Sequence, residues 1–299
     1  DMTELNISYA IDHGVDMVIS HHPFLFKPIH DIDLSTCKGR MIENLIRHRI
    51  TSFAAHTNLD SAVQGVNDAL AEKLGLQECK GFVPVMTYSS YKFTLYITAA
   101  HAKLLKKKLD SLRGKDIESY YVVDDADDFT ENIRVEFRVP GQLVKQVKDM
   151  ISSLDKSAKY DVYKLVNHGY KETMGRIGKF PFPMSVEEAL SYIKNKLEIP
   201  VLRYAGNRDR LVEKIAILGG AGAEFAGVAK SMGADLYLTG DLKYHEAQDA
   251  AMNGLVIADG GHFYTERVII PYLAKRLRDE FKTRGWNVGV LEDVRAKDI

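Results

Sequence analysis

The chain has 299 residues, of which 40 are Lys or Arg and 41 are Asp or Glu, so its net charge at neutral pH is -1. Hydrophobic residues make up 45% and charged residues 27%, a globular composition that excludes intrinsic disorder. The balanced charge argues against nucleic acid as a partner and against a general affinity for acidic membranes.

The cysteine content and the longest apolar runs set further limits. Two cysteines, Cys37 and Cys79, exclude a disulfide framework and favour a reducing compartment, so we expect a cytoplasmic location. No uncharged apolar run approaches the ~18 residues that suggest a membrane helix. The chain begins at Asp1 inside a helical pattern, and we expect further residues upstream.

The first segment alternates between helical and strand patterns. Apolar residues recur at helical spacing over about 3–13, and helices are also predicted over 36–49 and 65–74. Short apolar runs at Val15–Ile19 and Ile50–Ala55 predict strands between these helices. Continuous apolar strands that alternate with helices are typical of a parallel sheet covered on both faces.

The pattern changes to period-two alternation between residues 88 and 167, which is typical of half-buried strands. The predicted order is strand, helix, strand, strand, helix, strand, over 91–97, 101–112, 117–123, 133–139, 142–154 and 160–166. This is the ferredoxin-like order. We therefore predict a second, inserted domain over 88–167.

The first pattern returns after Gly175. Ser185 and Glu188 form a capping box at the start of a helix. The remaining predicted elements are strands over 201–204, 214–218, 235–239 and 255–258, a helix over 263–282 and a strand over 287–291. We therefore predict a discontinuous α/β domain over 1–87 and 168–299, with a mostly parallel sheet and helices on both faces.

Side chains of the metal-binding type follow three of the predicted strands. They are His21 and His22 after the first strand, His56 and Asp60 after the second, and His262 and Glu266 at the start of the last helix. The carboxyl ends of strands are where open α/β sheets bind ligands. Taken singly, these side chains also suit a surface loop, a helix N-cap and a solvated helix face. Their joint occurrence favours a metal site.

The composition of this set indicates two ions. Even three of its four imidazoles, together with its two carboxylates, are too many for one tetrahedral zinc with an open position, but they suit two divalent ions ~3.5–4 Å apart with a bridging carboxylate. Nitrogen and oxygen ligands without thiolate suit zinc, iron or manganese.

Two further features remain open on the sequence alone. The turn Gly219–Gly222 could present N–H groups to a phosphate or simply pack against the sheet. Asp241 and His245 could support the site, move protons or cap a helix.

Four motifs in order carry a family resemblance. They are Ser20-His21-His22-Pro23-Phe24, His56-Thr57-Asn58-Leu59-Asp60, Gly240-Asp241-Leu242-Lys243-Tyr244-His245-Glu246 and Asp259-Gly260-Gly261-His262-Phe263-Tyr264-Thr265-Glu266. Over about 1–88 and 168–299 the chain resembles the NIF-three-like family of GTP cyclohydrolase 1 type 2 homologues. That family normally has a further N-terminal segment and a longer insert.

The resemblance implies a site, an insert and an assembly. The ligands of two divalent ions would be His21, His22, Asp60, His262 and Glu266. The inserted domain would be similar to the PII signalling proteins, and the subunits would form a toroidal homohexamer.

The leading functional hypothesis is a metal-dependent hydrolase. The resemblance implies that GTP or a related nucleotide is its substrate, and His245 or His56 could shuttle protons. The alternative is a non-catalytic metal-binding regulatory or scaffold protein that forms a ring. Metal ligands look alike in both cases, so the sequence leaves both open.

Overall fold

The computed structural model describes residues 1–111, 118–123, 132–293 and 295. Residues 112 and 117, which we placed at the ends of a helix and of a strand, lie outside this part. The chain divides into two compact units, Asp1–Val83 with Thr173–Ile299 and Pro84–Glu172. Within the described residues, no helix combines the length and the apolar composition needed to cross a membrane.

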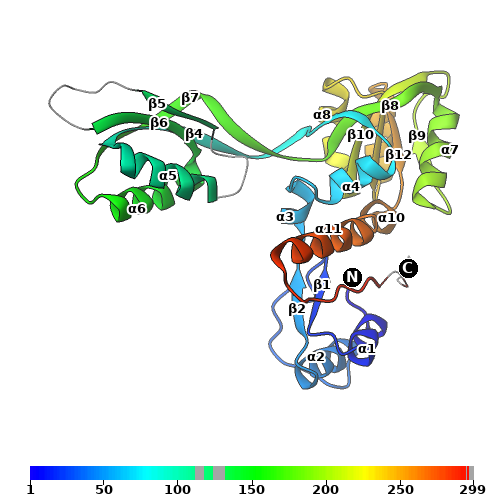
Figure 1. Ribbon diagram of the computed structural model, residues 1–299. Helices are drawn as coiled ribbons and strands as arrows, with labels where there is room; N and C mark the ends of the chain where they lie inside the picture. The colour runs from blue at the N-terminus through cyan, green and yellow to red at the C-terminus, as the bar shows by residue number, and fades with distance from the viewer. Residues whose placement is uncertain (112–117, 124–131, 294, 296–299) are drawn as a thin grey trace. The chain divides into compact units, whose positions relative to one another are not determined.

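The first unit begins with a two-stranded parallel sheet (Figure 1). Its elements and the two helices that follow are α1 (Glu4–Asp12), β1 (Met17–Ser20), α2 (Cys37–Arg47), β2 (Thr51–Ala54), α3 (Thr57–Ser61) and α4 (Val66–Lys73). The buried side chains between α1, α2 and the sheet are Ile7, Ala10, Met41, Leu45 and Ile50. In the register of the sheet Ser20 pairs with Ala54, so both strands end side by side.

A six-stranded sheet forms the centre of the first unit. Its strands, in spatial order, are β3 (Gln77–Lys80), β8 (Arg176–Ser185), β10 (Leu211–Ala221), β11 (Leu236–Gly240), β12 (Val256–Asp259) and β9 (Arg203–Ala205). Its helical segments are α7 (Val186–Leu197), η2 (Ala223–Phe225), α8 (Ala226–Ser231), α9 (Tyr244–Met252), α10 (His262–Glu266) and α11 (Ile269–Arg284).

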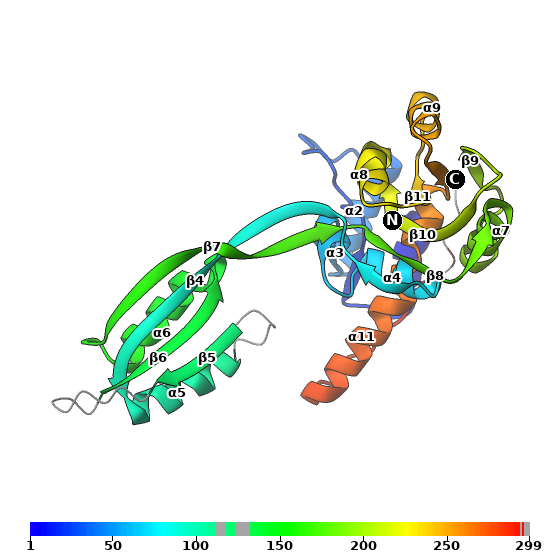
Figure 2. The ribbon, with the colours of Figure 1, turned by 90° about the horizontal axis from the view of Figure 1, so that it is seen from above.

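Both faces of the six-stranded sheet are covered, with α7 and α8 on opposite sides (Figure 2). Alternate residues of β10 point to the two faces. Ile215 and Ile217 pack in the core that contains α4 and α7, whereas Ala216 and Leu218 pack in the core that contains α8 and α9. All four are at most 2% exposed, which explains why the strand is a continuous apolar run.

The predicted mostly parallel sheet is wrong, because the observed sheet is mixed. Strands β10, β11 and β12 are parallel, but β8 is antiparallel to β10 and to β3, and β9 is antiparallel to β12. The sequence did not indicate β8, which contains Pro181 and Pro183. These prolines lie between the paired residues Lys179 and Met184, where the register shifts, so they need not donate to the sheet.

The C-terminal elements also differ from the prediction. The single helix predicted over 263–282 is two helices, α10 and α11, separated at residues 267–268. The strand predicted over 287–291 does not form. Instead, Arg278 of α11 donates to the carbonyl of Val290 at 2.9 Å, and Trp286 packs against Phe281. Contacts with α11 therefore replace strand pairing in this segment.

The second unit contains a four-stranded sheet in the order β5-β6-β4-β7. Its elements are β4 (Val83–Thr98), α5 (Ala99–Ser111), β5 (Glu118–Val123), β6 (Asn132–Pro140), η1 (Gly141–Leu143), α6 (Val144–Leu154) and β7 (Lys159–Met174). Both α5 and α6 cover one face of the sheet (Figure 1), where Phe93 stacks on Phe137 in the core. The order of strands and helices is the predicted one, while the relation to PII proteins stays a prediction.

Candidate metal centre

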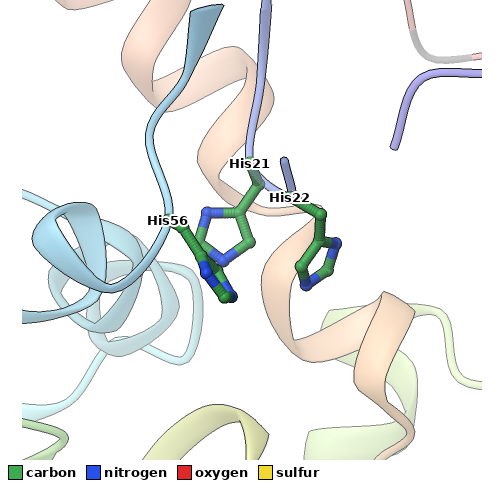
Figure 3. A group of neighbouring side chains, drawn as sticks. All are labelled: His21, His22 and His56. Atoms are coloured by element: carbon green, nitrogen blue, oxygen red, sulfur yellow. The ribbon is translucent and has the colours of Figure 1, made fainter. Parts of the chain in front are cut away.

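Two parallel strands deliver the first histidines to one place. His21 and His22 directly follow β1, and His56 follows β2 after Ala55. Because the strands end side by side, His21 and His56 point toward one another, with ring centroids 5.4 Å apart, and His22 lies beside them (Figure 3). Asp60 follows one turn later in α3 and is buried.

The third strand end is β12 of the six-stranded sheet. The turn Gly260-Gly261 connects it to α10, and Gly261 has φ +75°, a conformation that glycine adopts without strain. His262 and Glu266 then lie one helical turn apart on the same face of α10.

Glu266 lies at the centre of the cluster. Its Oε1 is 3.1 Å from His262 Nε2 and 3.6 Å from His21 Nε2, and its Oε2 is 3.4 Å from His22 Nε2. His21 Nε2 is also 3.5 Å from Asp60 Oδ1. Two groups of three could each hold a metal ion, namely His22, His262 and Glu266, and His21, Asp60 and Glu266. Both groups share Glu266.

The donor atoms of this cluster fit a metal better than they fit one another. Buried polar atoms normally have a hydrogen-bond partner. His21 Nε2 and Asp60 Oδ1 are buried and have none among the residues that the structure describes. Imidazole nitrogens and carboxylate oxygens without thiolate form the donor set of zinc, iron or manganese. The residues present therefore fit divalent cations.

The electrostatics of the cluster also suit cations. Burial alone would raise the pKa of Glu266, but the nearby His21 and His262 lower it to about 2. Contact with Glu266, opposed by burial and helped by Asp241, raises the pKa of His262 to about 9. Burial raises the pKa of Asp60 to about 6. The cluster therefore balances its carboxylates with protons on imidazole, which a metal cation would displace.

The turn Gly219–Gly222, whose role the sequence left open, lies next to these candidate ligands. Gly219 donates its N–H to Asn67 Oδ1 at 3.0 Å, and Gly220 donates to Thr265 Oγ1 at 3.0 Å. These N–H groups are already satisfied inside the protein, which favours packing over phosphate binding. Asn67 also donates to the carbonyl of Asp60, so it ties the turn to a ligand-bearing helix. On the sequence alone, Asn67 shows only its position in a helical pattern.

The two predicted proton shuttles differ in position. His56 forms a third group with His21 and His22, and its ring lies 5.2 Å from that of His22. His245 is exposed on α9 against Tyr244, and among the described residues it belongs to none of the three groups. A catalytic role for either residue stays a prediction.

Fold and site together define an α/β protein with a candidate divalent-metal site at the ends of three strands. The chain belongs to the Duf34/NIF3 (NGG1p interacting factor 3) family, whose model matches residues 1–297.

Relatives and solved structures agree with this membership. The chain is 32% identical to the GTP cyclohydrolase 1 type 2 homologs of Halalkalibacterium halodurans and of Bacillus subtilis strain 168, over 97% of this chain and 84% of each relative. The crystal structure of a Bacillus cereus protein related to NIF3 matches with a TM-score of 0.84 and 32% identity, over 100% of this chain and 86% of that one. A Staphylococcus aureus structure matches with a TM-score of 0.76 and 26% identity, over the same shares of the two chains.

Proposed function

We propose that this protein binds two divalent metal ions per subunit and uses them to hydrolyse a nucleotide-like substrate. The observation that carries the proposal is the pair of three-residue ligand groups that share Glu266. A shared carboxylate is the arrangement that places two ions close enough to act on one substrate. The buried, unpartnered atoms of His21 and Asp60 support the same assignment.

The two ligand groups differ in exposure, which suggests where a substrate enters. The side chains of His21 and Asp60 are 8% and 10% exposed, whereas those of His22 and His262 are 24% and 35% exposed. Structural metal sites are closed, and catalytic sites keep a position open. We therefore assign the closed group to a retained ion and the open group to the side that faces the substrate.

When bound, a pair of divalent ions supplies Lewis acidity that activates water and polarises the substrate. The chain's own residues then orient the reactants and move protons. His56 lies beside the ligands without belonging to either group that contains Glu266, so its imidazole is placed to accept or return a proton. His245, on α9, is the second candidate for this role.

The substrate class rests on relatives. Curated proteins at 32% identity are named GTP cyclohydrolase 1 type 2 homologs, which supports GTP or a related nucleotide as the compound to test first.

We expect metal-loaded protein to release product from at least one member of a panel of purine and pyrimidine nucleotides, measured by liquid chromatography. Asp60→Asn, which removes a ligand charge at nearly constant volume, should lose that activity. Asp209→Asn, a change on an exposed loop, should keep it. Stoichiometric metal with no turnover across the panel would instead support the alternative, a non-catalytic regulatory or scaffold ring.

The assembly and the insert complete the proposal. We expect a homohexamer in the cytoplasm, with a PII-like inserted domain, as the resemblance implies. Closed symmetry is the general rule for soluble oligomers. Six copies of a 33.6 kDa chain give a mass of about 200 kDa, which light scattering measures directly. A mass near that of one chain at micromolar concentration would contradict the hexamer.

A further inference from the structure

Each of the three ligand imidazoles is held at its outer nitrogen by an oxygen acceptor. His21 Nδ1 lies 2.8 Å from the backbone carbonyl oxygen of Ala55. His22 Nδ1 lies 2.8 Å from Asp1 Oδ1, and His262 Nδ1 lies 2.7 Å from Asp241 Oδ2. An imidazole that donates from Nδ1 carries its lone pair on Nε2. All three Nε2 atoms face Glu266, so all three rings are oriented to bind a metal that displaces the proton from Nε2.

The backbone of Asp241 would suit a glycine, so the role of its carboxylate needs an explanation. Asp241 has φ +55°, in the left-handed region that glycine adopts most readily and that Asp adopts at a smaller cost than most other residues. Its side chain is 56% exposed, so burial does not explain the choice of residue. A helix cap does not explain it either, because the N-cap of α9 is Lys243. The bond to His262 is the contact that a glycine would lose.

The charges of the outer carboxylates also match the site. Two divalent ions bring four positive charges, and Asp60 and Glu266 neutralise two of them. Asp241, bonded to His262, supplies a third negative charge, and the carboxylate of Asp1, bonded to His22, supplies a fourth beside the terminal ammonium group of the same residue. Carboxylate partners of this kind orient a ligating imidazole and raise its basicity.

We propose that Asp241 and Asp1 are positioning residues of the metal centre, which hold His262 and His22 with Nε2 directed at the ions and balance their charge. This inference rests on the proposed metal site. Both acidic partners hold imidazoles of the more exposed ligand group, whereas the buried His21 is held by a neutral carbonyl. The outer carboxylates therefore act mainly on the ion of the open group.

The experiment titrates apo protein with cobalt(II) and follows both calorimetry and the visible absorption of the bound ion. The variants are Asp241→Gly, Asp241→Asn and Asp1→Asn, and the control is Asp249→Asn on the exposed face of α9. Asn keeps an acceptor oxygen but loses the charge, while Gly loses both and relieves the backbone.

We expect Asp241→Gly to weaken one of the two cobalt sites by ~10–100-fold, the usual loss for an outer-shell partner, and to change the cobalt spectrum. Its apo melting temperature should stay unchanged or rise, since glycine suits the backbone. Asp241→Asn and Asp1→Asn should fall between Asp241→Gly and the control. Wild-type affinity and spectrum in Asp241→Gly would overturn this inference alone. A wild-type protein that takes up no cobalt would overturn the proposed metal centre itself.

Discussion

Replacing Glu266 by Gln should remove most of the stabilisation that divalent metal gives to this protein. Glu266 is the residue that both ligand groups share, with oxygens 3.1–3.6 Å from three imidazole nitrogens. A Gln side chain has nearly the same volume but offers one neutral oxygen in place of two charged ones. We therefore expect both ions to bind more weakly, by more than the ~10–100-fold that loss of an outer partner costs.

Thermal unfolding with and without added metal measures this effect. A ligand at 100 times its Kd stabilises a folded protein by ~2.7 kcal/mol, and the wild type should show a gain of this order. Glu266→Gln should show a small fraction of it. The matched control is Glu187→Gln, an exposed position in the first turn of α7, which should retain the full gain. Equal gains in all three proteins would remove Glu266 from the site.

The grouping of these candidate ligands could be predicted because it depends on strand ends. Apolar runs in the sequence predicted β1, β2 and β12, and the candidate ligands directly follow these runs. Ligands of α/β folds bind at the carboxyl ends of the strands, so the sequence predicts that His21, Asp60 and Glu266 lie close together. The separate two-stranded sheet that carries two of these strand ends was not expected, yet it delivers its residues to the same place.

Other parts of the site and the fold carry no local signal. Asp1 and His22 are 21 positions apart, and no pattern in the sequence around either residue predicts their contact. Strand β3 is exposed at all four residues, so it shows no apolar pattern. Strand β8 is interrupted by prolines. Both strands were therefore missed, and with them the antiparallel pairing of β8 with β3 and β10 that makes the sheet mixed.

Replacing Gly220 by Ala should disable the metal centre at a modest cost to the fold. Gly220 has φ +71°, where a non-glycine residue costs ~1–2 kcal/mol. A Cβ atom there would lie 2.2 Å from Glu266 Oε1 and 3.2 Å from His262 Nε2. The atom that the added Cβ would meet is the end of a side chain and not backbone, so we expect the Glu266 carboxylate to be displaced while the protein still folds. That movement removes the shared carboxylate from both ligand groups.

Gly227→Ala provides the control for this substitution, because Gly227 lies in α8 and, apart from its chain neighbours and the adjacent helix backbone, no atom of the described residues would lie within 4 Å of an added Cβ. Alanine is favoured over glycine inside a helix by ~0.5–1 kcal/mol, so this variant should be as stable as the wild type or more stable, with an unchanged metal count. Elemental analysis and calorimetric titration measure the metal content and the metal affinity of the two variants. Gly220→Ala should lose at least the ~1–2 kcal/mol of backbone strain in the apo protein, because the displaced Glu266 also gives up its contacts with His21 and His262, and it should bind far less metal than the wild type. Full metal content in Gly220→Ala would show that the ions do not require Glu266 in its present position. It would contradict the assignment of Glu266 as the carboxylate that both ligand groups share.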